Sequence, residues 1–512
     1  MTQQIVIAGS GFAGLWAALS AARAVALAGR DGDVAITVVS PAPQLHIRPR
    51  LYEAVLEGMA PDLAALFEAV GVRHVPGVVT TIHAGRRAVD VAGTDGARFT
   101  LPYNRFVLAA GSRLFTPPIP GLAEHAFNVD QLDSAHALDA HLKALAAQPE
   151  TAARNTVVVA GGGFTGIETA AEMPDRLRAI LGADAKVRVV VVEQAPAIGP
   201  DLGPVPRPVI EQALAECGVE IVAGTAVAAI DADGVTTATG ERIAAATVVW
   251  TAGARANPLA AQISDGHDRF GRVPADPFLR AVGNDGIFVT GDVARAATDD
   301  LGNVAAMSCQ HALSLGRVAG HNAAAELVGL PTHPYSQPKY VTCLDLGPWG
   351  GALHRRLGPA GPADPRRGQG GEARDQHQMD LPAPAGPRSG LRRRQPRLCD
   401  RSLTMALRSR APRHRRNAAP HVHYFRWNGH ASRARQLSTP VPLHSFPWRN
   451  DRNIGPSPPA RRKSRPLTVE QRNRLDLQAK SAHHRENIHN INKKLCPITC
   501  REKAHLNEYS HF

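Results

Sequence analysis

The chain has 512 residues and a formal net charge of +13, and this length predicts roughly two to four domains with sizeable cores. The charge is unevenly divided: residues 351–512 hold 33 Lys and Arg against 11 Asp and Glu, whereas residues 1–350 hold 25 against 34. The first 350 residues are therefore mildly acidic, and we expect no nucleic acid partner for them.

The apolar segments and the cysteines exclude further classes of protein. No apolar run approaches the roughly 20 residues that span a bilayer. The first residues, Met1 to Gln4, have neither the basic start nor the cleavage site of a signal peptide, so we expect a cytoplasmic protein. The six cysteines lie far apart except for Cys496 and Cys500, and they predict neither a disulfide framework nor a zinc site.

The first informative motif is a GxGxxG pattern in which Gly9, Gly11 and Gly14 follow the apolar run 5–8. The alanine-rich segment 15–22 comes next and is typical of a helix. In such a strand-turn-helix unit the glycines permit a tight turn, the approach of a pyrophosphate and close packing of helix on strand, in that order. The free N–H groups at the helix start favour the anion. We therefore expect a dinucleotide here.

The next stretch predicts a strand and a basic loop. Residues 34–39 predict the second strand of the unit, and an acidic residue at its end would hold the adenosine ribose. This chain has Ser40 there, which is a weaker hydrogen-bonding partner. In the loop after this strand, Arg50 is interpreted as a solvated residue. Arg48 is the candidate for a fixed cation that stabilises negative charge on a reduced cofactor.

Residues 88–100 predict a hairpin because apolar and polar residues alternate around glycines. The apolar strand 106–109 then ends in Ala110 and Gly111, whose small size allows a ligand or a neighbouring backbone to approach. Prolines within 117–120 mark a crossing into another domain.

A second, more complete unit of the same kind comes next. Another apolar run leads into Gly161, Gly163 and Gly166 and then into a helical segment. The apolar strand 187–192 ends at Glu193, whose carboxylate would bind both ribose hydroxyls of NAD and repel the 2′-phosphate of NADP. This predicts a preference for NADH, and a surface glutamate at a strand end is the alternative. Two such units predict one enzyme with two dinucleotides.

Two later strands end in small or acidic residues. The run 248–250 is followed by Ala252 and Gly253, which repeats the apolar-then-small pattern of the first unit. Another strand leads into Gly291 and Asp292. The carboxylate would accept hydrogen bonds from ligand hydroxyl groups while the glycine approaches a pyrophosphate. A simple helix cap is the alternative interpretation of Asp292.

The sequence changes character at Gly351. Arg, Pro and Gly become frequent and hydrophobic periodicity ends, so we expect no helix or strand from there to Phe512. One interpretation is a disordered basic tail that binds acidic surfaces or nucleic acid. The favoured interpretation is a shifted reading frame. Met379 requires the codon ATG and Asp380 begins with G, so reading one base later gives TGG, a tryptophan codon.

With these motifs in place, residues 1–350 resemble the FAD-dependent pyridine nucleotide oxidoreductases. The resemblance implies FAD on the first unit and NADH on the second, with hydride passing from the nicotinamide to the flavin. Arg48 would then lie beside the flavin ring, and Asp292 would bind ribityl hydroxyls. The residues that carry the resemblance are Gly9, Gly11, Gly14, 109–112, Gly161, Gly163, Gly166, Glu193, Ala252, Gly253 and 290–292.

The cysteines bear on the branch of the family. Disulfide reductases need two close cysteines just after the first unit, whereas the first cysteine here is Cys217. Sulfide:quinone oxidoreductases also use paired cysteines, for which the chain offers Cys309 and Cys343, and we interpret both as core thiols. The chain therefore looks most like the type II NADH dehydrogenases, which pass two electrons to a quinone.

That resemblance implies catalytic roles for two residues. Glu168, in the helix after the second glycine motif, would orient the reacting groups or handle protons. Gln310 would contact the flavin or the quinone from the start of a helix whose dipole stabilises the reduced ring. His311 is interpreted as a core or surface histidine.

Together these features predict an α/β protein with two Rossmann-like dinucleotide-binding domains and an irregular C-terminal tail. The predicted FAD domain comprises residues 1–112 and 256–330, with the NAD(H) domain at 113–255. Residues 331–350 would begin a C-terminal interface region, and 351–512 form the basic, frame-shifted or disordered tail.

The favoured function is transfer of electrons from NADH through FAD to a quinone or another small acceptor. An NADH-dependent reductase of an iron–sulfur protein and a slow-turnover nucleotide-sensing flavoprotein are the alternatives. An intact C-terminal region would support a homodimer and a peripheral contact with the inner membrane.

Overall fold

The computed structural model describes residues 2–357 and 422–425. These residues all belong to one compact unit of the chain. Most of the predicted tail, and with it the frame-shift interpretation, lies outside the described residues. Among the described residues no helix is both long and apolar enough to cross a bilayer.

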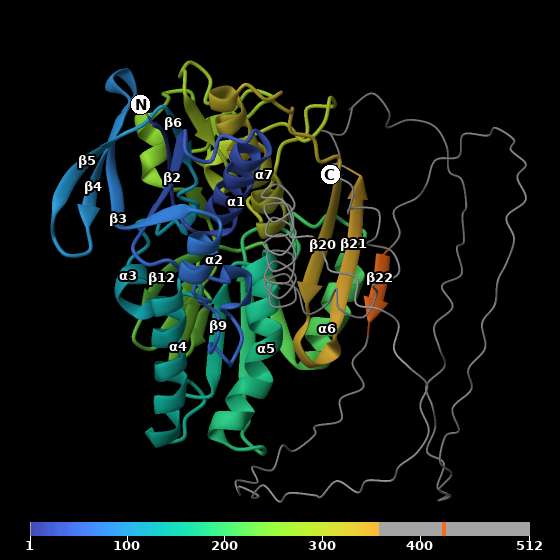
Figure 1. Ribbon diagram of the computed structural model, residues 1–512. Coiled ribbons are helices and arrows are strands. Elements are labelled where there is room, and N and C mark those ends of the chain that lie inside the picture. Colours follow the sequence, from blue (N-terminus) through green and yellow to red (C-terminus); the bar gives the residue numbers. More distant parts are fainter. Residues whose placement is uncertain (1, 358–421, 426–512) are drawn as a thin grey trace, which may run out of the picture. The chain divides into compact units, whose positions relative to one another are not determined.

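The first glycine motif belongs to a seven-stranded sheet (Figure 1). Strands β18, β6, β1, β2 and β3 are parallel in this order, and β4 and β5 extend β3 as an antiparallel hairpin. This is the doubly wound order in which a ligand binds at the carboxyl ends of the strands. The strands are β1 Gln3–Ala8, β2 Val34–Ser40, β3 Val72–His83, β4 Ala88–Gly93, β5 Arg98–Pro102, β6 Arg105–Leu108 and β18 Ile287–Val289.

The second glycine motif belongs to a separate five-stranded parallel sheet in the order β11, β10, β9, β15 and β8. A three-stranded antiparallel sheet, β12–β14, precedes β15 in the chain. The two parallel sheets confirm the predicted pair of Rossmann-like units. The strands are β8 Ala126–Phe127, β9 Thr156–Ala160, β10 Arg188–Glu193, β11 Val219–Ala223, β12 Val227–Asp231, β13 Gly234–Thr237, β14 Arg242–Ala244 and β15 Thr247–Trp250.

Helices cover the sheets, and two of them begin at the glycine motifs. The helix after the first glycine motif is α1, and the one after the second is α5. Both are longer than the helical segments expected from the sequence. The helices are α1 Phe12–Leu27, α2 Ala64–Ala69, α3 Leu122–His125, α4 Leu132–Ala144, α5 Phe164–Leu181, α6 Arg207–Cys217 and α7 Cys309–Val328.

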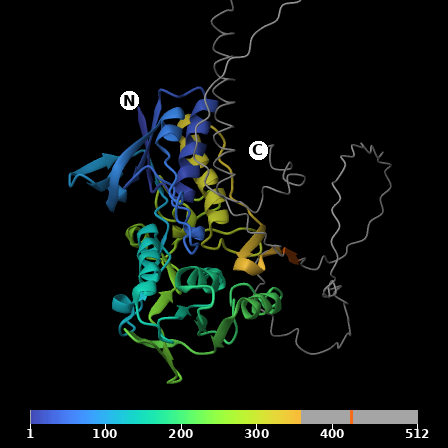
Figure 2. The same cartoon turned by 90° about the horizontal axis from the view of Figure 1, so that it is seen from below.

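Helices α1 and α7 lie side by side in both ribbon views (Figures 1 and 2) because glycines on α7 remove the side chains between them. A Cβ on Gly316 would lie 2.4 Å from the carbonyl oxygen of Ala13, and a Cβ on Gly320 would lie 2.0 Å from that of Ala17. This contact carries the start of α7 to the first glycine motif.

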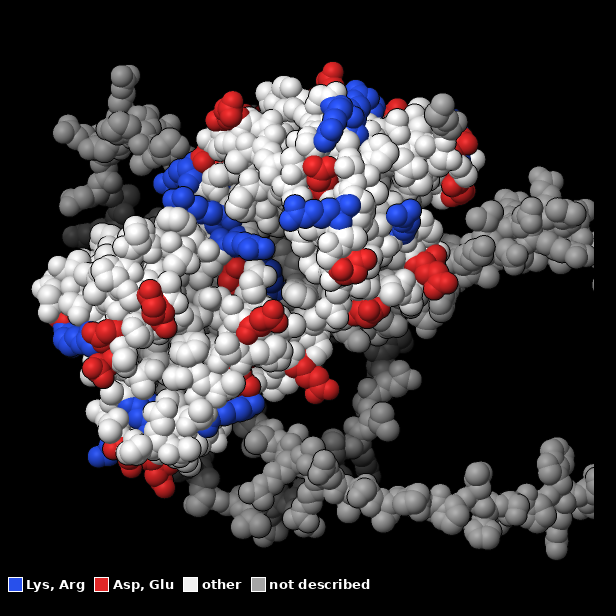
Figure 3. All heavy atoms as spheres, turned by 90° about the vertical axis from the view of Figure 1, so that its left-hand side faces the viewer, with Lys and Arg blue, Asp and Glu red and all other residues white. Residues whose placement is uncertain are grey.

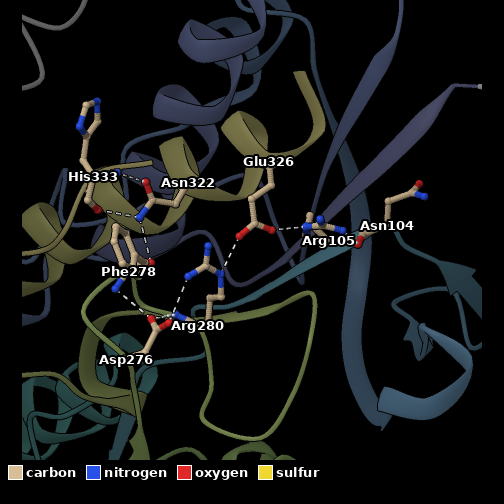
Figure 4. A network of polar contacts seen from close by, with 8 residues as sticks. All are labelled: Asn104, Arg105, Asp276, Phe278, Arg280, Asn322, Glu326 and His333. Carbon is tan, nitrogen blue, oxygen red and sulfur yellow. Dashed lines mark hydrogen bonds and ion pairs between the residues drawn. The ribbon is translucent and has the colours of Figure 1, made fainter. Parts of the chain in front are cut away.

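A polar network ties the far end of α7 to the sheet (Figure 4). Glu326 accepts from the Nε atoms of Arg105 on β6, at 2.5 Å, and of Arg280 before β18, at 2.6 Å. The fully buried Asn322 donates to the carbonyl oxygens of Phe278 and His333. Because Arg105 begins β6, this network lies at the opposite end of that strand from the predicted FAD site.

The loop after β2 contributes to the core of the second unit. Ile47, Leu51, Tyr52, Leu56 and Met59 are buried in the same hydrophobic cluster as strands β9 and β10. This part of the predicted FAD domain is therefore packed against the predicted NAD(H) domain. The proposed domain boundaries stay predictions. Two short strands, β7 Ser112–Leu114 and β16 Ala254–Ala256, pair antiparallel. They lie at the two predicted crossings of the chain between the FAD domain and the NAD(H) domain.

The C-terminal strands differ from the sequence expectation. Strand β20, Lys339–Asp345, pairs with β21, Gly351–Leu357, which in turn pairs with β22, Val422–Phe425. The expectation that no strand occurs after Gly351 is therefore wrong for β21 and β22. Backbone pairing of β21 with β20, and of β22 with β21, provides their hydrogen bonds, and such pairing does not require the apolar alternation that the sequence lacks. A further short pair joins β17, Val273–Pro274, to β19, Ala294–Arg295.

Candidate functional site

The first glycine motif forms a tight turn between β1 and α1. Gly9 has φ +108°, and a Cβ there would lie 2.5 Å from the carbonyl oxygen of Ala109. A Cβ on Gly14 would lie 1.9 Å from the Gly9 carbonyl oxygen. At Gly11, the N-cap residue of α1, nothing lies within 4 Å of such an atom. Open space beside the free N–H groups of the first helical turn fits the pyrophosphate of a dinucleotide.

The second glycine motif repeats this geometry. Gly161 has φ +113°, and a Cβ on Gly166 would lie 1.8 Å from the Gly161 carbonyl oxygen. Gly163, the N-cap residue of α5, again has nothing within 4 Å of a Cβ. A Cβ on Gly161 would lie 3.0 Å from the Ala252 methyl group, so Ala252 borders the turn. Both turns thus enclose their outer glycines and leave the middle one open.

Glu193 ends β10 and points back to the second glycine motif. The residue is 6% exposed, which differs from the surface glutamate of the alternative interpretation. Its carboxylate accepts hydrogen bonds from the Gly162 N–H at 2.5 Å and from the Ala195 N–H at 2.7 Å. These donors hold the carboxylate beside the turn. Gly253 lies beside the paired strands β7 and β16, and its carbonyl oxygen accepts from the Phe115 N–H at 2.6 Å.

Ser40 lies at the end of β2 with its hydroxyl engaged locally. The residue is 4% exposed. Its Oγ donates to the Ala42 carbonyl oxygen at 2.7 Å and lies 2.9 Å from Nε2 of His74. Ser10 in the glycine turn donates to the Gln44 carbonyl oxygen at 2.7 Å, so the loop after β2 is fastened to the turn. Any ribose contact of Ser40 competes with these bonds.

Arg48 begins the short 3₁₀ helix η1, Arg48–Arg50, and lies among polar groups from three segments. Its guanidinium forms an ion pair with Asp130 and donates from Nε to the Asp130 carbonyl oxygen at 3.0 Å. Its Nη1 lies 3.4 Å from Ser112 Oγ and 3.9 Å from an Asp292 carboxylate oxygen. A Cβ on Gly111 would lie 3.8 Å from Nη1. The structure therefore brings Arg48, Gly111 and Asp292 together.

Asp292 lies in the short 3₁₀ helix η5, Gly291–Val293, after β18. Its carboxylate accepts from Ser112 Oγ at 2.7 Å, so the side chain faces the start of β7. Gly291 has φ +69°, and a Cβ there would lie 2.7 Å from the Ala13 methyl group on α1. The adjacent Thr290 hydroxyl is buried and has no hydrogen-bonding partner within the described chain.

Ala110 and Gly111 lie beside Asn257, where the chain returns from the second unit to the first. The Ala110 carbonyl oxygen accepts from Asn257 Nδ2 at 3.4 Å, and the Gly111 carbonyl oxygen accepts from the Asn257 N–H at 2.9 Å. The end of β6 is therefore fixed beside the point where the chain returns to the first unit.

Glu168 and Gln310 come from different units and are both held by β20. The backbone N–H of Asp345 donates to Glu168 Oε1 at 3.2 Å, and that of Val341 donates to Gln310 Oε1 at 3.2 Å. Glu168 lies on α5 and Gln310 lies in the first turn of α7. One strand thus bridges the two residues for which the resemblance implies catalytic roles.

The surroundings of these residues favour uncharged side chains. Burial, followed by the negative charges of Asp345 and Glu53, raises the pKa of Glu168 well above its usual range. Burial lowers the pKa of His311 to about 4. His311 is 3% exposed and stacks on Tyr340 with ring centroids 4.5 Å apart. Of the two interpretations of His311, the core histidine is confirmed.

Sequence reasoning missed the partners that fix these groups. Asp130 pairs with Arg48 from a loop 82 residues away, and Tyr52 Oη donates to Asp345 Oδ2 at 3.0 Å across 293 residues. Neither contact has a spacing signal, because each joins two loops or strand ends.

The cysteines of the described residues form no disulfide. Cys309 and Cys343 are therefore not joined as a redox pair in this structure. Cys309 is partly buried, whereas Cys343 is exposed, so the interpretation of Cys343 as a core thiol is wrong. Cys343 lies on the outward face of β20, because Thr342 and Leu344 are buried and side chains alternate along a strand. No group of three or more metal-ligating side chains occurs among the described residues.

A cavity of about 620 Å³ lies away from the glycine motifs. Residues 54–60 line one side, and Leu132, His136, Asp139 and Lys143 on α4 line the other. None of the predicted site residues borders it. The candidate site therefore consists of the two glycine turns and the groups around Arg48 and β20.

Comparison with known proteins decides the family. Residues 3–316 match the family model described as pyridine nucleotide-disulphide oxidoreductase. The chain belongs to this family. It is an oxidoreductase with FAD and NADH as cofactors, and the resemblance to type II NADH dehydrogenases is confirmed.

The curated relatives include NADH dehydrogenases. A NADH dehydrogenase-like protein of Mycobacterium tuberculosis is 48% identical over 347 residues, which cover 67% of this chain and 86% of the relative. A type II NADH:quinone oxidoreductase of the same organism is 31% identical, with 57% and 66% covered.

Among solved structures, the type II NADH dehydrogenase of Plasmodium falciparum superposes with a TM-score of 0.58 at 13% identity, covering 70% of this chain and 90% of that one. A NAD-dependent persulfide reductase of A. fulgidus superposes with a TM-score of 0.57 at 23% identity and covers 69% of this chain. This chain spans 64% of that reductase, less than two thirds of its length. Both likenesses concern the fold.

Proposed function

We propose that this family member passes electrons from NADH, through FAD, to a quinone. The observation that carries the proposal is the bridge of β20 between Glu168 and Gln310, because it joins one side chain from each dinucleotide unit. The 31% identity to a type II NADH:quinone oxidoreductase supports the acceptor. A demethylphylloquinone reductase of Synechocystis, 28% identical over 359 residues, supports it further.

The two glycine turns would bind the cofactors' pyrophosphates at the starts of α1 and α5. FAD, when bound, supplies a carrier that accepts hydride from NADH and delivers two electrons to the acceptor. Glu193 would orient NADH by accepting hydrogen bonds from its ribose hydroxyls and would exclude a 2′-phosphate by repulsion. Asp292 and the unpartnered Thr290 hydroxyl would bind the hydroxyl groups of FAD near the end of β6.

Arg48 would serve as a fixed cation at the first unit. Its guanidinium is held by Asp130, so it does not need to reorganise when negative charge develops on a bound ring. Asp292 is 3.9 Å from the same guanidinium. These two carboxylates offset the cation, and its net contribution would therefore be smaller than that of an unpaired arginine.

Proton balance gives Glu168 its role. The overall reaction is NADH + H⁺ + Q → NAD⁺ + QH₂, so one proton must be taken up for each quinone reduced. Burial raises the pKa of Glu168 well above its usual range, which favours the protonated form of its carboxyl group. Such a group is suited to hold that proton and release it at Oε2, because Oε1 accepts from the Asp345 N–H. Gln310 has no acidic group that could supply a proton, and it would orient the acceptor through its side-chain amide.

The surface bears on the alternatives. The face shown in Figure 3 carries a row of Lys and Arg across its middle, with Asp and Glu scattered around it. A protein acceptor could dock on such a row, whereas the identities to the two quinone-reducing relatives favour the small-molecule acceptor. We also propose that the C-terminal region supports a homodimer and a peripheral contact with a membrane.

An anaerobic titration tests the proposed function. NADH is added to the purified full chain while the flavin absorbance is recorded, and a soluble ubiquinone analogue is then added. Bleaching by NADH followed by recovery on quinone addition is the expected result. Bleaching that the quinone does not reverse, while ferricyanide does, would contradict a quinone acceptor. Negligible turnover with every acceptor would favour a nucleotide sensor.

A further inference from the structure

We propose that Tyr52 and Asp345 are positioning residues that hold Glu168 in the orientation in which it releases a proton to the reduced acceptor. The proposal rests on the proposed function for the identity of the acceptor. Its basis is a chain of contacts through three segments: the loop after η1, the end of β20, and α5.

The first step is the direct bond to Glu168. The Asp345 backbone N–H donates to Glu168 Oε1 at 3.2 Å. Because a carboxyl group rotates freely about its last bond, a donor on one oxygen fixes which oxygen is turned away and left to exchange a proton. The position of the Asp345 backbone therefore sets the orientation of the Glu168 carboxyl group.

The second step is what fixes Asp345. Its Oδ2 accepts from Tyr52 Oη at 3.0 Å, and its Oδ1 accepts from the Gly347 N–H at 3.0 Å. Gly347 has φ +59°, and a Cβ there would lie 2.6 Å from the Ala171 carbonyl oxygen on α5. The turn after β20 is thus pressed against the helix that carries Glu168. Asp345 cannot shift without breaking one of these contacts.

The third step is what fixes Tyr52. The residue is 5% exposed and lies in the hydrophobic cluster of the second unit. Its carbonyl oxygen accepts from Arg176 Nη1 at 3.3 Å, and Arg176 is itself paired with Asp139 at 2.9 Å. Tyr52 is therefore held through its backbone carbonyl oxygen and through its phenol hydroxyl. It reaches Asp345 from the loop that also contains Arg48.

The carboxylates around this chain of contacts raise one another's pKa values. Against them, the Asp345 N–H bond lowers the pKa of Glu168, Arg50 lowers that of Asp345 and Arg176 lowers that of Glu172. Burial raises the pKa of Asp345 and of Tyr52, and the Tyr52 hydrogen bond partly offsets the effect on Asp345. Burial and neighbouring carboxylates also raise the pKa of Glu172, one turn along α5. The nearby cations are occupied: Arg50 pairs with Glu53, and Arg176 pairs with Asp139. An ionised Asp345 raises the pKa of Glu168, because a like charge favours the protonated form.

Two variants separate orientation from charge. Tyr52→Phe removes the hydroxyl that anchors Asp345 and keeps the buried ring. Asp345→Asn removes the negative charge and keeps the backbone N–H and one side-chain acceptor for the Gly347 N–H, while its NH₂ group can donate to the Tyr52 oxygen in place of the lost acceptor. Tyr335→Phe is the matched control, because it removes a buried phenol that bonds Gln337 instead. All are made in the full chain, and flavin content is measured for each.

The kinetic test compares the two half-reactions over a range of pH. In Tyr52→Phe we expect bleaching by NADH and reoxidation by ferricyanide at the parent rates, with reoxidation by the ubiquinone analogue slowed about threefold to tenfold, the effect of one lost hydrogen bond. In Asp345→Asn the alkaline limb of quinone-dependent reoxidation moves to lower pH. Parent behaviour in both variants would overturn the proposal. So would equal slowing of quinone and ferricyanide, which indicates a merely structural role.

A spectroscopic test needs no electron acceptor. The infrared band of a protonated buried carboxyl group that disappears in Glu168→Gln is followed as the pH rises. In Asp345→Asn this band should be lost at lower pH than in the parent, because the repelling charge is gone. An unchanged titration would overturn the proposal even if quinone turnover is established. A shifted titration would support it even if quinone reduction fails.

Discussion

Substitution of single glycines in the second motif separates folding from nucleotide binding. In Gly166→Ala the new methyl group would lie 1.8 Å from the Gly161 carbonyl oxygen. That contact must open by about 1.6 Å to reach the 3.4 Å of ordinary van der Waals contact. In Gly163→Ala the methyl group meets nothing within 4 Å, so it occupies the space in which the pyrophosphate is expected to lie.

The expected magnitudes derive from these contacts. Overpacking costs about 1–3 kcal/mol, and the upper end applies to Gly166→Ala because both sides are backbone. The better helix propensity of alanine returns at most about 1 kcal/mol. For a unit of this size, the net loss of about 2 kcal/mol corresponds to a melting temperature lower by about 3 °C. Gly163→Ala loses about 1 kcal/mol or less as a helix cap, but its Kd for NADH should rise tenfold or more.

Thermal unfolding and anaerobic NADH titration of the two variants are the assays. We expect Gly166→Ala to melt about 3 °C below the parent, and Gly163→Ala to melt near it with normal FAD content but weak NADH binding. The reasoning would be refuted if Gly166→Ala melted at the parent temperature. It would also be refuted if Gly163→Ala bound NADH with the parent's affinity, since the open space at Gly163 would then not be the pyrophosphate site.

Three further predictions concern charge. Glu193→Arg should erode the preference for NADH over NADPH, measured as the ratio of their kcat/KM values, and an unchanged ratio would contradict this assignment. The pKa of His311 falls from 6.5 to about 4 on burial, so its neutral ring stabilises the fold above pH 6.5. That contribution, at most about 3 kcal/mol, is lost as the pH falls toward 4. In His311→Phe the urea midpoint should depend less on pH between pH 6.5 and 4 than it does in the parent. The same pH dependence as in the parent would count against burial of His311 as the cause. Glu326→Gln should lower the free energy of unfolding in urea at neutral pH by about 1–2 kcal/mol, because it weakens the contacts to Arg105 and Arg280, and should leave NADH binding unchanged.

The local part of the site could be predicted from the sequence. The glycine turns at Gly9 and Gly161 can be inferred from spacing alone, because a strand, a tight turn and a helix start leave few other arrangements. The position of Glu193 at the end of β10 can be inferred from the length of the apolar run. Each of these features depends on neighbours close in the chain.

The partners of Arg48 and Glu168 could not be predicted in this way. Arg48 meets Asp130, and Glu168 meets the Asp345 backbone 177 residues later. Such contacts depend on how two sheets and a C-terminal strand pack, which hydrophobic periodicity does not specify. The strand β21 was missed for a related reason, since it forms by pairing with β20 and has no apolar pattern of its own.

The position of β20 bears on the change of sequence character at Gly351. The strand and the turn at Gly347 complete the contacts to Glu168 and Gln310 before that point. Under the proposed function, entry of electrons from NADH and the proton held at Glu168 would therefore depend on residues up to about 350. The proposed dimer and membrane contacts depend on the residues after that point. If the coding DNA around Trp349 to Ala352 carries a frame shift, repair of the frame should leave bleaching by NADH and reoxidation by a water-soluble quinone unchanged. It should restore membrane binding and activity with a quinone confined to the bilayer.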